Sequence, residues 1–230
     1  MVSHQGQKSD EKGVINMGRL LVFEGIDGSG KSTQIEMLSN FLKSQNQEVF
    51  VTREPGGTEF GEKCRKLFLT EKLDGLTEAC LAFASRNEHI LQKIIPALRL
   101  GQWVLCDRFS DSTIAYQGYG RGVEIKFLRE MAMNIEKQLS DIRIIYVHTS
   151  LEKCLERIKK RGGDKNKFDN ASRIFYEKVI CGYSNIVKER GDNIVKVDGN
   201  DEIEKVFSKI LHSVPELEQF NTKSNHLGRI

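Results

Sequence analysis

A glycine-rich segment near the start of the chain constrains its fold more than any other feature. Residues 25–32 read G-I-D-G-S-G-K-S and match the pattern G-x-x-x-x-G-K-[S/T]. The pattern follows a short apolar run at 19–26 and opens a segment with helical spacing at 31–45. A phosphate-binding loop requires this strand–loop–helix context, because glycines let successive backbone N–H groups turn toward phosphate oxygens. The segment therefore predicts a site for a nucleoside triphosphate.

The loop residues have distinct expected roles. We expect Lys31 to reach the β- and γ-phosphates of ATP and the Ser32 hydroxyl to ligate Mg²⁺. Asp107 closes another apolar run and offers a carboxylate to the same Mg²⁺ shell. ATP and Mg²⁺ are thus the expected cofactors. The residues expected to bind the nucleotide are Gly25, Ile26, Asp27, Gly28, Ser29, Gly30, Lys31 and Ser32.

Apolar runs alternate with helical patterns along the chain, which predicts an α/β fold with a five-stranded parallel sheet flanked by helices. Ligands of such sheets bind beyond the carboxyl ends of the strands. The expected strands are 19–26, 48–54, 103–108, 142–149 and 193–199. The expected helices are 31–45, 77–99, 124–138, 151–161 and 171–190, with one more near the C-terminus.

The 230 residues fit a single domain, for which we expect the bounds 17–213. Residues 1–16 are polar and read as a disordered N-terminal extension, and 214–230 as a flexible C-terminal tail. A Gly/Lys/Asn-rich segment interrupts the helical pattern at 162–170, and we expect a short mobile lid at about 159–170.

Charge and cysteine content exclude several classes of protein. A formal net charge of +3 gives no reason to expect a nucleic-acid partner. The five widely spaced cysteines read as reduced thiols rather than as a disulfide framework or a zinc site. No apolar run approaches the roughly 20 residues that span a bilayer, and the N-terminus lacks the apolar centre of a signal peptide. These features predict a cytoplasmic protein without a membrane partner.

Two arginines at strand ends point to a second phosphorylated substrate. Arg53 closes the second expected strand, and the pair Asp107-Arg108 closes the third. A guanidinium binds phosphate bidentately, and both arginines would face the glycine-rich loop across one crevice. This arrangement favours a kinase that acts on a phosphorylated acceptor.

One further motif suggests a different class of protein. Residues 166–169 read N-K-F-D and match the guanine-binding pattern N-K-x-D of GTPases. The match lies in a polar break between helices, without the apolar strand that precedes it in GTPases. No D-x-x-G switch follows either of the later strands, 103–108 or 142–149. We therefore reject a GTPase.

The sequence resembles the bacterial thymidylate kinases. The resemblance rests on four segments in the family's order: VFEGIDGSGKSTQ, TREPGG, LAFASRNEH and CDRFSDSTIAYQGYGRG. It covers about residues 18–211 and implies a P-loop nucleoside monophosphate kinase with a mobile lid. The family transfers the γ-phosphate of ATP to dTMP, giving dTDP for dTTP biosynthesis, and usually forms homodimers.

The resemblance assigns a role to individual residues. Asp27 and Arg108 match residues that approach the sugar and the phosphates, and Arg53 matches the arginine that clamps the dTMP phosphate. Arg86 matches the arginine that reads the thymine edge, and Tyr116 matches the ring that disfavours a ribose 2′-hydroxyl.

The resemblance therefore implies two sets of site residues. The expected substrate-binding residues are Arg53, Phe83, Arg86, Arg108, Thr113, Tyr116 and Gln117. The expected catalytic residues are Lys31, Arg108, Asp27 and Lys167.

Two departures from the family pattern affect these roles. The ring that stacks on the base lies four residues before the arginine in many relatives, but that position is Ala82 here, so we expect Phe83 to stack instead. The variable loop positions hold no basic residue, so the family pattern expects a cation in the lid. Lys167 is our first choice, and Lys165 and Arg161 are alternatives.

Two other functions remain to be tested. A deoxynucleoside kinase would phosphorylate a sugar hydroxyl and would have less use for Arg53. An ATP-binding switch without transfer activity would lack an acceptor site. Comparing thymidine with dTMP as acceptors separates the first from a thymidylate kinase, and ADP release with and without dTMP separates the second.

Overall fold

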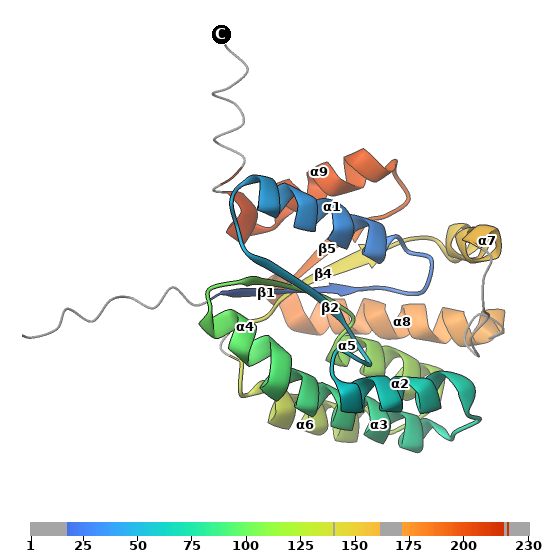
Figure 1. Ribbon diagram of the computed structural model, residues 1–230. Coiled ribbons are helices and arrows are strands. Elements are labelled where there is room, and N and C mark those ends of the chain that lie inside the picture. The colour runs from blue at the N-terminus through green and yellow to red at the C-terminus, as the bar shows by residue number, and fades with distance from the viewer. Residues whose placement is uncertain (1–17, 140, 162–171, 219, 221–230) are drawn as a thin grey trace, which may run out of the picture.

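Five of the apolar runs form one parallel β-sheet (Figure 1). The computed structural model describes residues 18–139, 141–161, 172–218 and 220. Within them the strands are β1 (Arg19–Glu24), β2 (Val49–Arg53), β3 (Trp103–Asp107), β4 (Arg143–His148) and β5 (Ile194–Asp198). They lie in the order β2-β3-β1-β4-β5, and every neighbouring pair is parallel. The predicted five-stranded parallel sheet is therefore confirmed.

The order of the strands fixes where a ligand can enter. The chain runs from β1 outward to β2, returns through β3 and then crosses β1 to reach β4. The carboxyl end of the central strand β1 is thus the point at which the strand order reverses, and parallel α/β sheets bind ligands at such a point. The glycine-rich loop leaves the sheet there.

Helices cover both faces of the sheet (Figure 1). Helices α1 (Lys31–Ser44) and α9 (Ile203–Ser213) cover one face. The other face is covered by α3 (Gly75–His89), α6 (Ile125–Glu136) and α8 (Arg173–Arg190). Successive side chains of β1 point to opposite faces. Leu21 and Phe23 accordingly belong to the apolar core under α1 and α9, and Leu20 and Val22 to the larger core on the opposite face.

The long predicted helix at 77–99 is three consecutive helical segments. It consists of α3 (Gly75–His89), a π-helical turn η1 (Ile90–Ile94) and α4 (Ile95–Arg99). Pro96 has no N–H and cannot form the i→i−4 hydrogen bond of an α-helix, and the wider turn before it accommodates this loss. The helix begins earlier than predicted because Asp74 caps it, its Oδ1 accepting from the N–H groups of Leu76 at 2.9 Å and Thr77 at 3.1 Å.

Two helical regions were not predicted from the sequence, and both border the candidate site. Helix α2 (Glu59–Thr70) begins at Thr58, whose Oγ1 accepts from the Gly61 N–H at 2.9 Å. The short helix α5 (Ser110–Thr113) continues into a π-helical segment η2 (Ile114–Gly120). Helix α6 (Ile125–Glu136) follows and closely matches its prediction.

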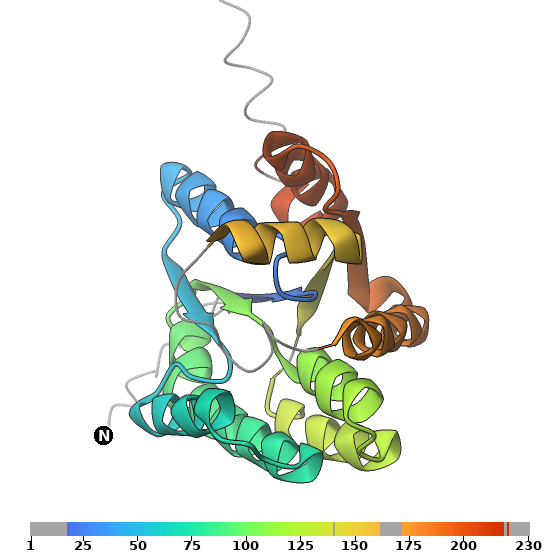
Figure 2. The same cartoon turned by 90° about the vertical axis from the view of Figure 1, so that its right-hand side faces the viewer.

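Helix α7 (Leu151–Arg161) lies at the carboxyl edge of the sheet. Figure 2 looks onto this edge and shows α7 crossing it beside α1. Residues 159–161 of the expected lid form the last turn of α7, whereas 162–171 lie outside the described residues. Helix α8 (Arg173–Arg190) and the short turn η3 (Gly191–Asn193) then lead into β5.

The C-terminal boundary lies later than expected. The turn η4 (Pro215–Leu217) follows α9, and Val214, Leu217 and Phe220 are buried in the core under α1 and α9. The ring of Phe220 lies 6.0 Å from that of Trp103. Packed chain therefore continues past residue 213, where the expected flexible tail was to begin. Residues 1–17 and 221–230 lie outside the described residues.

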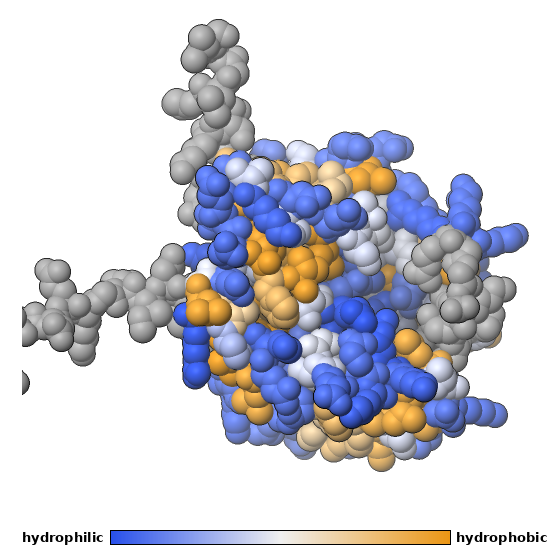
Figure 3. Space-filling model, in the orientation of Figure 1, coloured by the Kyte–Doolittle hydropathy of each residue, from blue (hydrophilic) through white to orange (hydrophobic). Residues whose placement is uncertain are grey.

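The outer edge of the sheet carries an apolar surface. β2 is an edge strand, and its Val51 is 47% exposed. Figure 3 shows a hydrophobic patch over this edge of the sheet, between the side of the molecule that carries α1 and the side that carries α2. Among the described residues, none of the helices combines the length and the apolar character that a membrane span requires.

Candidate active site

The glycine-rich loop connects β1 to the first turn of α1. Gly28 and Gly30 adopt φ values of 78° and 101°, a region that glycine enters without strain. A Cβ on Gly28 would lie 2.5 Å from the carbonyl oxygen of Cys154, so only glycine fits there. Lys31 folds back over the loop, and its Nζ donates to the carbonyls of Gly25 and Ile26, both at 3.0 Å. Burial lowers the pKa of Lys31, and the charge of Arg108 lowers it further.

A cleft of about 550 Å³ lies in front of this loop. Five cationic side chains line it against three carboxylates, so the cleft suits a polyanion. The cations are Lys31, Arg53, Arg65, Arg108 and Arg157, and the carboxylates are Asp27, Glu54 and Asp107. The sequence-based expectation that Arg53 and Arg108 face the same crevice as Lys31 is confirmed.

An oxygen pair in the cleft fits a hard divalent cation. Ser32 Oγ donates to Asp107 Oδ2 at 3.0 Å, and Asp107 Oδ1 is buried without a hydrogen-bond partner among the described residues. Mg²⁺ takes oxygen ligands at about 2.1 Å in octahedral geometry, which places adjacent ligands about 3 Å apart. The hydroxyl and the carboxylate therefore fit a shared Mg²⁺ ion.

Arg108 occupies the centre of the site and has an unusual backbone. Its φ of 74° lies in the left-handed region, which costs a non-glycine residue about 1–3 kcal/mol. The guanidinium donates from Nη1 to the Gly25 carbonyl at 3.0 Å and from Nη2 to Asp27 Oδ1 at 2.7 Å. The Tyr116 hydroxyl donates to Asp27 Oδ2 at 3.1 Å, and the Arg108 guanidinium lies 5.0 Å from the centre of the Tyr116 ring.

The Arg108–Asp27 ion pair determines the charge states of both residues. Burial disfavours the Asp27 carboxylate, but Arg108 and then Lys31 outweigh it and lower the pKa of Asp27 to about 2. Burial likewise opposes the charge on Arg108, but Asp27 raises the pKa of Arg108 above its usual value. Both groups are therefore charged at neutral pH.

A second, smaller pocket of about 100 Å³ adjoins the cleft. Asp27, Glu54, Arg65 and Arg108 line both cavities, so the ion pair forms part of the wall between them. The remaining wall is largely apolar. It is made by Pro55, Phe68, Leu69, Ala82 and Phe109, with Arg86, Ser112, Thr113, Tyr116 and Gln117 as its polar members.

Arg86 presents a buried donor at this pocket. Its side chain is 2% exposed and is held by Glu54 Oε2 at 2.6 Å from Nε and by Thr113 Oγ1 at 3.2 Å from Nη2. The guanidinium carbon lies 5.2 Å from the ring centres of both Phe83 and Phe109. Nη1 is buried and has no partner among the described residues. A buried N–H group without an acceptor costs about 1–3 kcal/mol, so the site favours a ligand that brings one.

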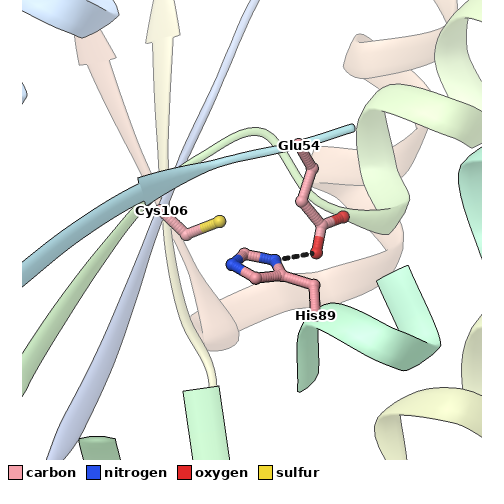
Figure 4. A group of neighbouring side chains, drawn as sticks. All are labelled: Glu54, His89 and Cys106. Carbon is pink, nitrogen blue, oxygen red and sulfur yellow. Dashed lines mark hydrogen bonds and ion pairs between the residues drawn. The ribbon is translucent and has the colours of Figure 1, made fainter. Parts of the chain in front are cut away.

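Glu54 belongs to a buried hydrogen-bond network that orients Arg86. Glu54 Oε1 lies 2.9 Å from His89 Nδ1, and His89 Nε2 lies 2.7 Å from Thr52 Oγ1. Figure 4 shows the side chains of Glu54, His89 and Cys106 pointing toward one another. Each offers one atom that could ligate a metal, and these atoms lie within 4.8 Å of one another. These atoms are already engaged, because Cys106 Sγ donates to the Arg108 carbonyl and burial raises the thiol pKa well above its usual value. We therefore interpret the cluster as a hydrogen-bond network rather than a metal site.

The structure separates the predicted site residues into three groups. Thr113, Tyr116 and Gln117 line the small pocket as expected, and Gln117 Nε2 also donates to Glu78 Oε2 at 2.9 Å. Phe83 is 1% exposed and does not line the pocket, which does not support base stacking by this ring. The expected lid cation Lys167 and its alternative Lys165 lie outside the described residues.

Several residues of the site were not expected from the sequence. Glu24 is fully buried and accepts from the N–H groups of Phe109 at 2.7 Å and Ser112 at 3.1 Å, which holds the start of α5 against the sheet. Arg157 of α7 donates to the carbonyls of Gly28 and Ser29, both at 3.2 Å. The available signal for Arg157 in the sequence was a basic residue two positions before the expected lid.

The known proteins described next, to which this chain is similar, are thymidylate kinases. A family model described as Thymidylate kinase matches residues 23–210. The thymidylate kinase of Wolbachia pipientis subsp. Culex pipiens is 42% identical over 195 residues, covering 83% of this chain and 93% of that protein. The thymidylate kinase of Staphylococcus epidermidis is 38% identical over 202 residues, covering 86% and 98%. The crystal structure of thymidylate kinase from Ehrlichia chaffeensis matches with a TM-score of 0.66 at 30% identity, covering 85% of this chain and 97% of that one.

Proposed function

Because the chain belongs to the thymidylate kinase family, we propose that it transfers the γ-phosphate of ATP to dTMP, giving dTDP and ADP for dTTP biosynthesis. One observation carries the proposal for these residues. Two cavities meet at the Asp27–Arg108 ion pair, one polyanion-binding and next to the glycine-rich loop, the other small and largely apolar. ATP in the first and dTMP in the second would bring their phosphates together at that wall.

The cleft supplies positioning and charge for this reaction. A phosphate oxygen of dTMP is already a competent nucleophile, so catalysis consists of aligning two anions and neutralising their charge. Lys31 would release its bonds to the loop carbonyls and reach the β- and γ-phosphates. Arg108 would contact the transferring group, and Arg53 would hold the dTMP phosphate. Asp27 would keep Arg108 oriented while accepting a hydrogen bond from Tyr116.

Ser32 and Asp107 would hold Mg²⁺, which when bound neutralises charge on the phosphate oxygens of ATP. The Ser32 hydroxyl and the Asp107 carboxylate already lie within hydrogen-bond distance of each other. In the free protein this hydrogen bond keeps both oxygens directed into the cleft.

The lining of the small pocket favours the binding of a pyrimidine base that carries a carbonyl group at its edge. The free Nη1 of Arg86 would donate to such a carbonyl, while Glu54 and Thr113 hold the rest of the guanidinium. Tyr116 lines the same pocket beside Asp27, where it would crowd a ribose 2′-hydroxyl. These contacts favour dTMP over purine monophosphates and over ribonucleotides.

Lys167 remains our proposal for the lid cation. Arg157 is an additional candidate within the described residues, because it already lies against the loop carbonyls. From the family resemblance we also propose that the protein is a homodimer and lies in the cytoplasm. Analytical ultracentrifugation measures whether it is a dimer.

An ADP-release assay tests the function directly. ATP-Mg²⁺ is supplied with dTMP, dUMP, dCMP, dGMP or thymidine, and the Lys31→Ala variant prepared in parallel controls for contaminating kinases. We expect ADP release with dTMP to be far higher than with any other acceptor, and ADP release by the variant to stay at background. A preference for thymidine would indicate a deoxynucleoside kinase instead. ADP release at a rate that does not depend on the acceptor would indicate an ATPase and refute the proposal.

A further inference from the structure

The apolar wall of the small pocket has a different origin from the one the sequence suggests. A ring was expected from α3, four or three residues before Arg86. Position 82 is alanine, and Phe83 lies outside the pocket lining. The pocket nevertheless contains phenylalanine side chains, because Phe68 of α2 and Phe109 after β3 line it.

Phe83 belongs to α3 but does not line the pocket. Ala82 and Arg86 are four residues apart on α3 and share one face, which borders the pocket. Phe83 lies one position further round the helix. The Arg86 guanidinium carbon lies 5.2 Å from the centre of the Phe83 ring, and Phe83 is 1% exposed, so Phe83 packs against Arg86 instead of facing the pocket.

Phe68 lines the small pocket from the neighbouring helix α2. Arg65 and Phe68 are three residues apart on α2 and share a face, and both line the small pocket. Arg65 also lines the larger cleft in front of the glycine-rich loop, and its Nη1 donates a hydrogen bond to the Pro55 carbonyl at 3.0 Å. One face of α2 thus presents a cation where the two cavities meet and a ring inside the smaller one.

Phe109 is less suited to receive a base. It is 2% exposed, less than Phe68, and the Arg86 guanidinium carbon lies 5.2 Å from the centre of its ring. Phe68 is 7% exposed and Ala82 is 4% exposed, and both belong to the core on that face of the sheet. A small side chain at position 82 leaves space in the pocket that a larger one would fill.

We propose that Phe68 provides the ring on which the base of the monophosphate stacks, and that Ala82 is small because Phe68 fills this role from the neighbouring helix. The inference rests on the proposed function and identifies a specificity-determining residue within the same site. It makes the position of the base depend on how α2 packs against α3. Ring–base stacking is worth enough to change affinity by about tenfold to a hundredfold.

The test measures dTMP affinity by calorimetry together with the KM values for dTMP and ATP. Phe68→Ala is expected to raise the dissociation constant and the KM for dTMP by about tenfold to a hundredfold, while the KM for ATP stays within about twofold. Phe68→Tyr keeps the ring and should retain affinity near that of the natural protein. Phe60→Ala is the matched control, since Phe60 lies on the same helix, is 45% exposed and does not line the pocket.

A swap variant separates stacking from general packing. Phe68→Ala combined with Ala82→Phe moves the ring to α3, and we expect dTMP affinity to recover at least partly. Phe68→Leu covers the case in which Phe68→Ala does not fold, because leucine keeps the apolar contact and removes the ring. It should still lose about tenfold in dTMP affinity.

The outcomes distinguish this inference from the proposed function. Unchanged dTMP affinity in both folded variants, Phe68→Ala and Phe68→Leu, would overturn the inference while leaving the proposed function intact. A loss of affinity in Phe109→Leu but not in Phe68→Leu would assign the stacking to Phe109 instead. Failure of the natural protein to bind or phosphorylate dTMP would refute the proposed function itself.

Discussion

The buried ion pair between Glu54 and Arg86 allows a quantitative test of the hydrogen-bond network described above. Glu54 is 1% exposed, Arg86 is 2% exposed, and the closest oxygen and nitrogen atoms are 2.6 Å apart. The change Glu54→Gln removes the charge of one partner but not the hydrogen bonds. The amide oxygen can still accept from Arg86, and the amide nitrogen can donate to His89 Nδ1 if the imidazole proton moves to Nε2 and is donated to Thr52.

The expected loss of stability follows from the guanidinium that stays behind. Leaving a buried charge without its partner costs about 3–5 kcal/mol, and the retained hydrogen bonds put this variant near the lower figure. For a chain of this length, about 3 kcal/mol lowers Tm by roughly 10 °C. The Arg86 donor would also be less well oriented, so the KM for dTMP should rise in the same variant.

Urea denaturation followed by circular dichroism measures the difference in the free energy of unfolding. The matched control is Glu59→Gln, which breaks the ion pair with Lys63 on the surface of α2, where the two side chains are 87% and 71% exposed. Exposed pairs contribute at most about 1 kcal/mol in general. A double variant, Glu54→Gln with Arg86→Met, removes the remaining charge and should recover part of the loss. Equal stability of Glu54→Gln and Glu59→Gln, or no recovery in the double variant, would refute the reasoning.

Two further predictions concern the larger cleft, in front of the glycine-rich loop. The pKa of Asp27 is lowered to about 2 in the folded protein from 3.8, so its ion pair stabilises the fold above pH 4 and loses this effect as pH falls toward 2. The excess stability of the natural protein over Asp27→Asn should therefore shrink by about 1 kcal/mol between pH 6 and pH 3, and a constant difference in urea titrations would contradict the assigned charge state. Arg157→Ala should raise the KM for ATP by about tenfold with little effect on dTMP, because charge-assisted hydrogen bonds contribute about 1.5–3 kcal/mol. Lys159→Ala, an exposed change on the same helix, is its control, and an equal effect of both changes would exclude a specific role for Arg157.

The parts of the fold that the sequence predicted are those with local signals. The strands are short apolar runs bounded by Gly, Pro or charged residues, and the glycine-rich loop carries its own conformational requirement. Helix α2 was not predicted, although five of its 12 residues are apolar; three of these, Phe60, Leu67 and Leu69, are not buried. Its start does have a signal, Thr58 followed by acidic residues in the first turn, which is typical of a capped helix.

The site residues that the sequence did not predict depend on packing between helices. Nothing near position 68 marks Phe68 as a ligand contact, since its placement follows from how α2 lies against α3. Glu54 and His89 are 35 positions apart and meet only because β2 ends beside α3. A periodic pattern reports which face of a helix is apolar but not which neighbour that face meets.

The two arginines at the strand ends line one cleft, as the sequence predicted, and their positions in the sheet explain why their surroundings differ. Arg53 lies opposite Asp107 in the parallel register, and Arg108 lies one residue beyond. Glu54 and Arg108 each follow the last residue of their strand, and the backbone of Arg108 is left-handed, so each pair is divided between two environments at the point where regular strand geometry ends. In Arg53-Glu54, the arginine is 52% exposed at the cleft and the glutamate is buried against Arg86. In Asp107-Arg108, the carboxylate pairs with Ser32 and the guanidinium with Asp27. Inserting one residue before Asp107 would place its carboxylate at the position from which the Arg108 guanidinium now contacts Asp27, and inserting one before Arg53 would place a guanidinium at the buried position of Glu54, against Arg86. Each change would set like charges against each other, and this ties both pairs to the ends of their strands.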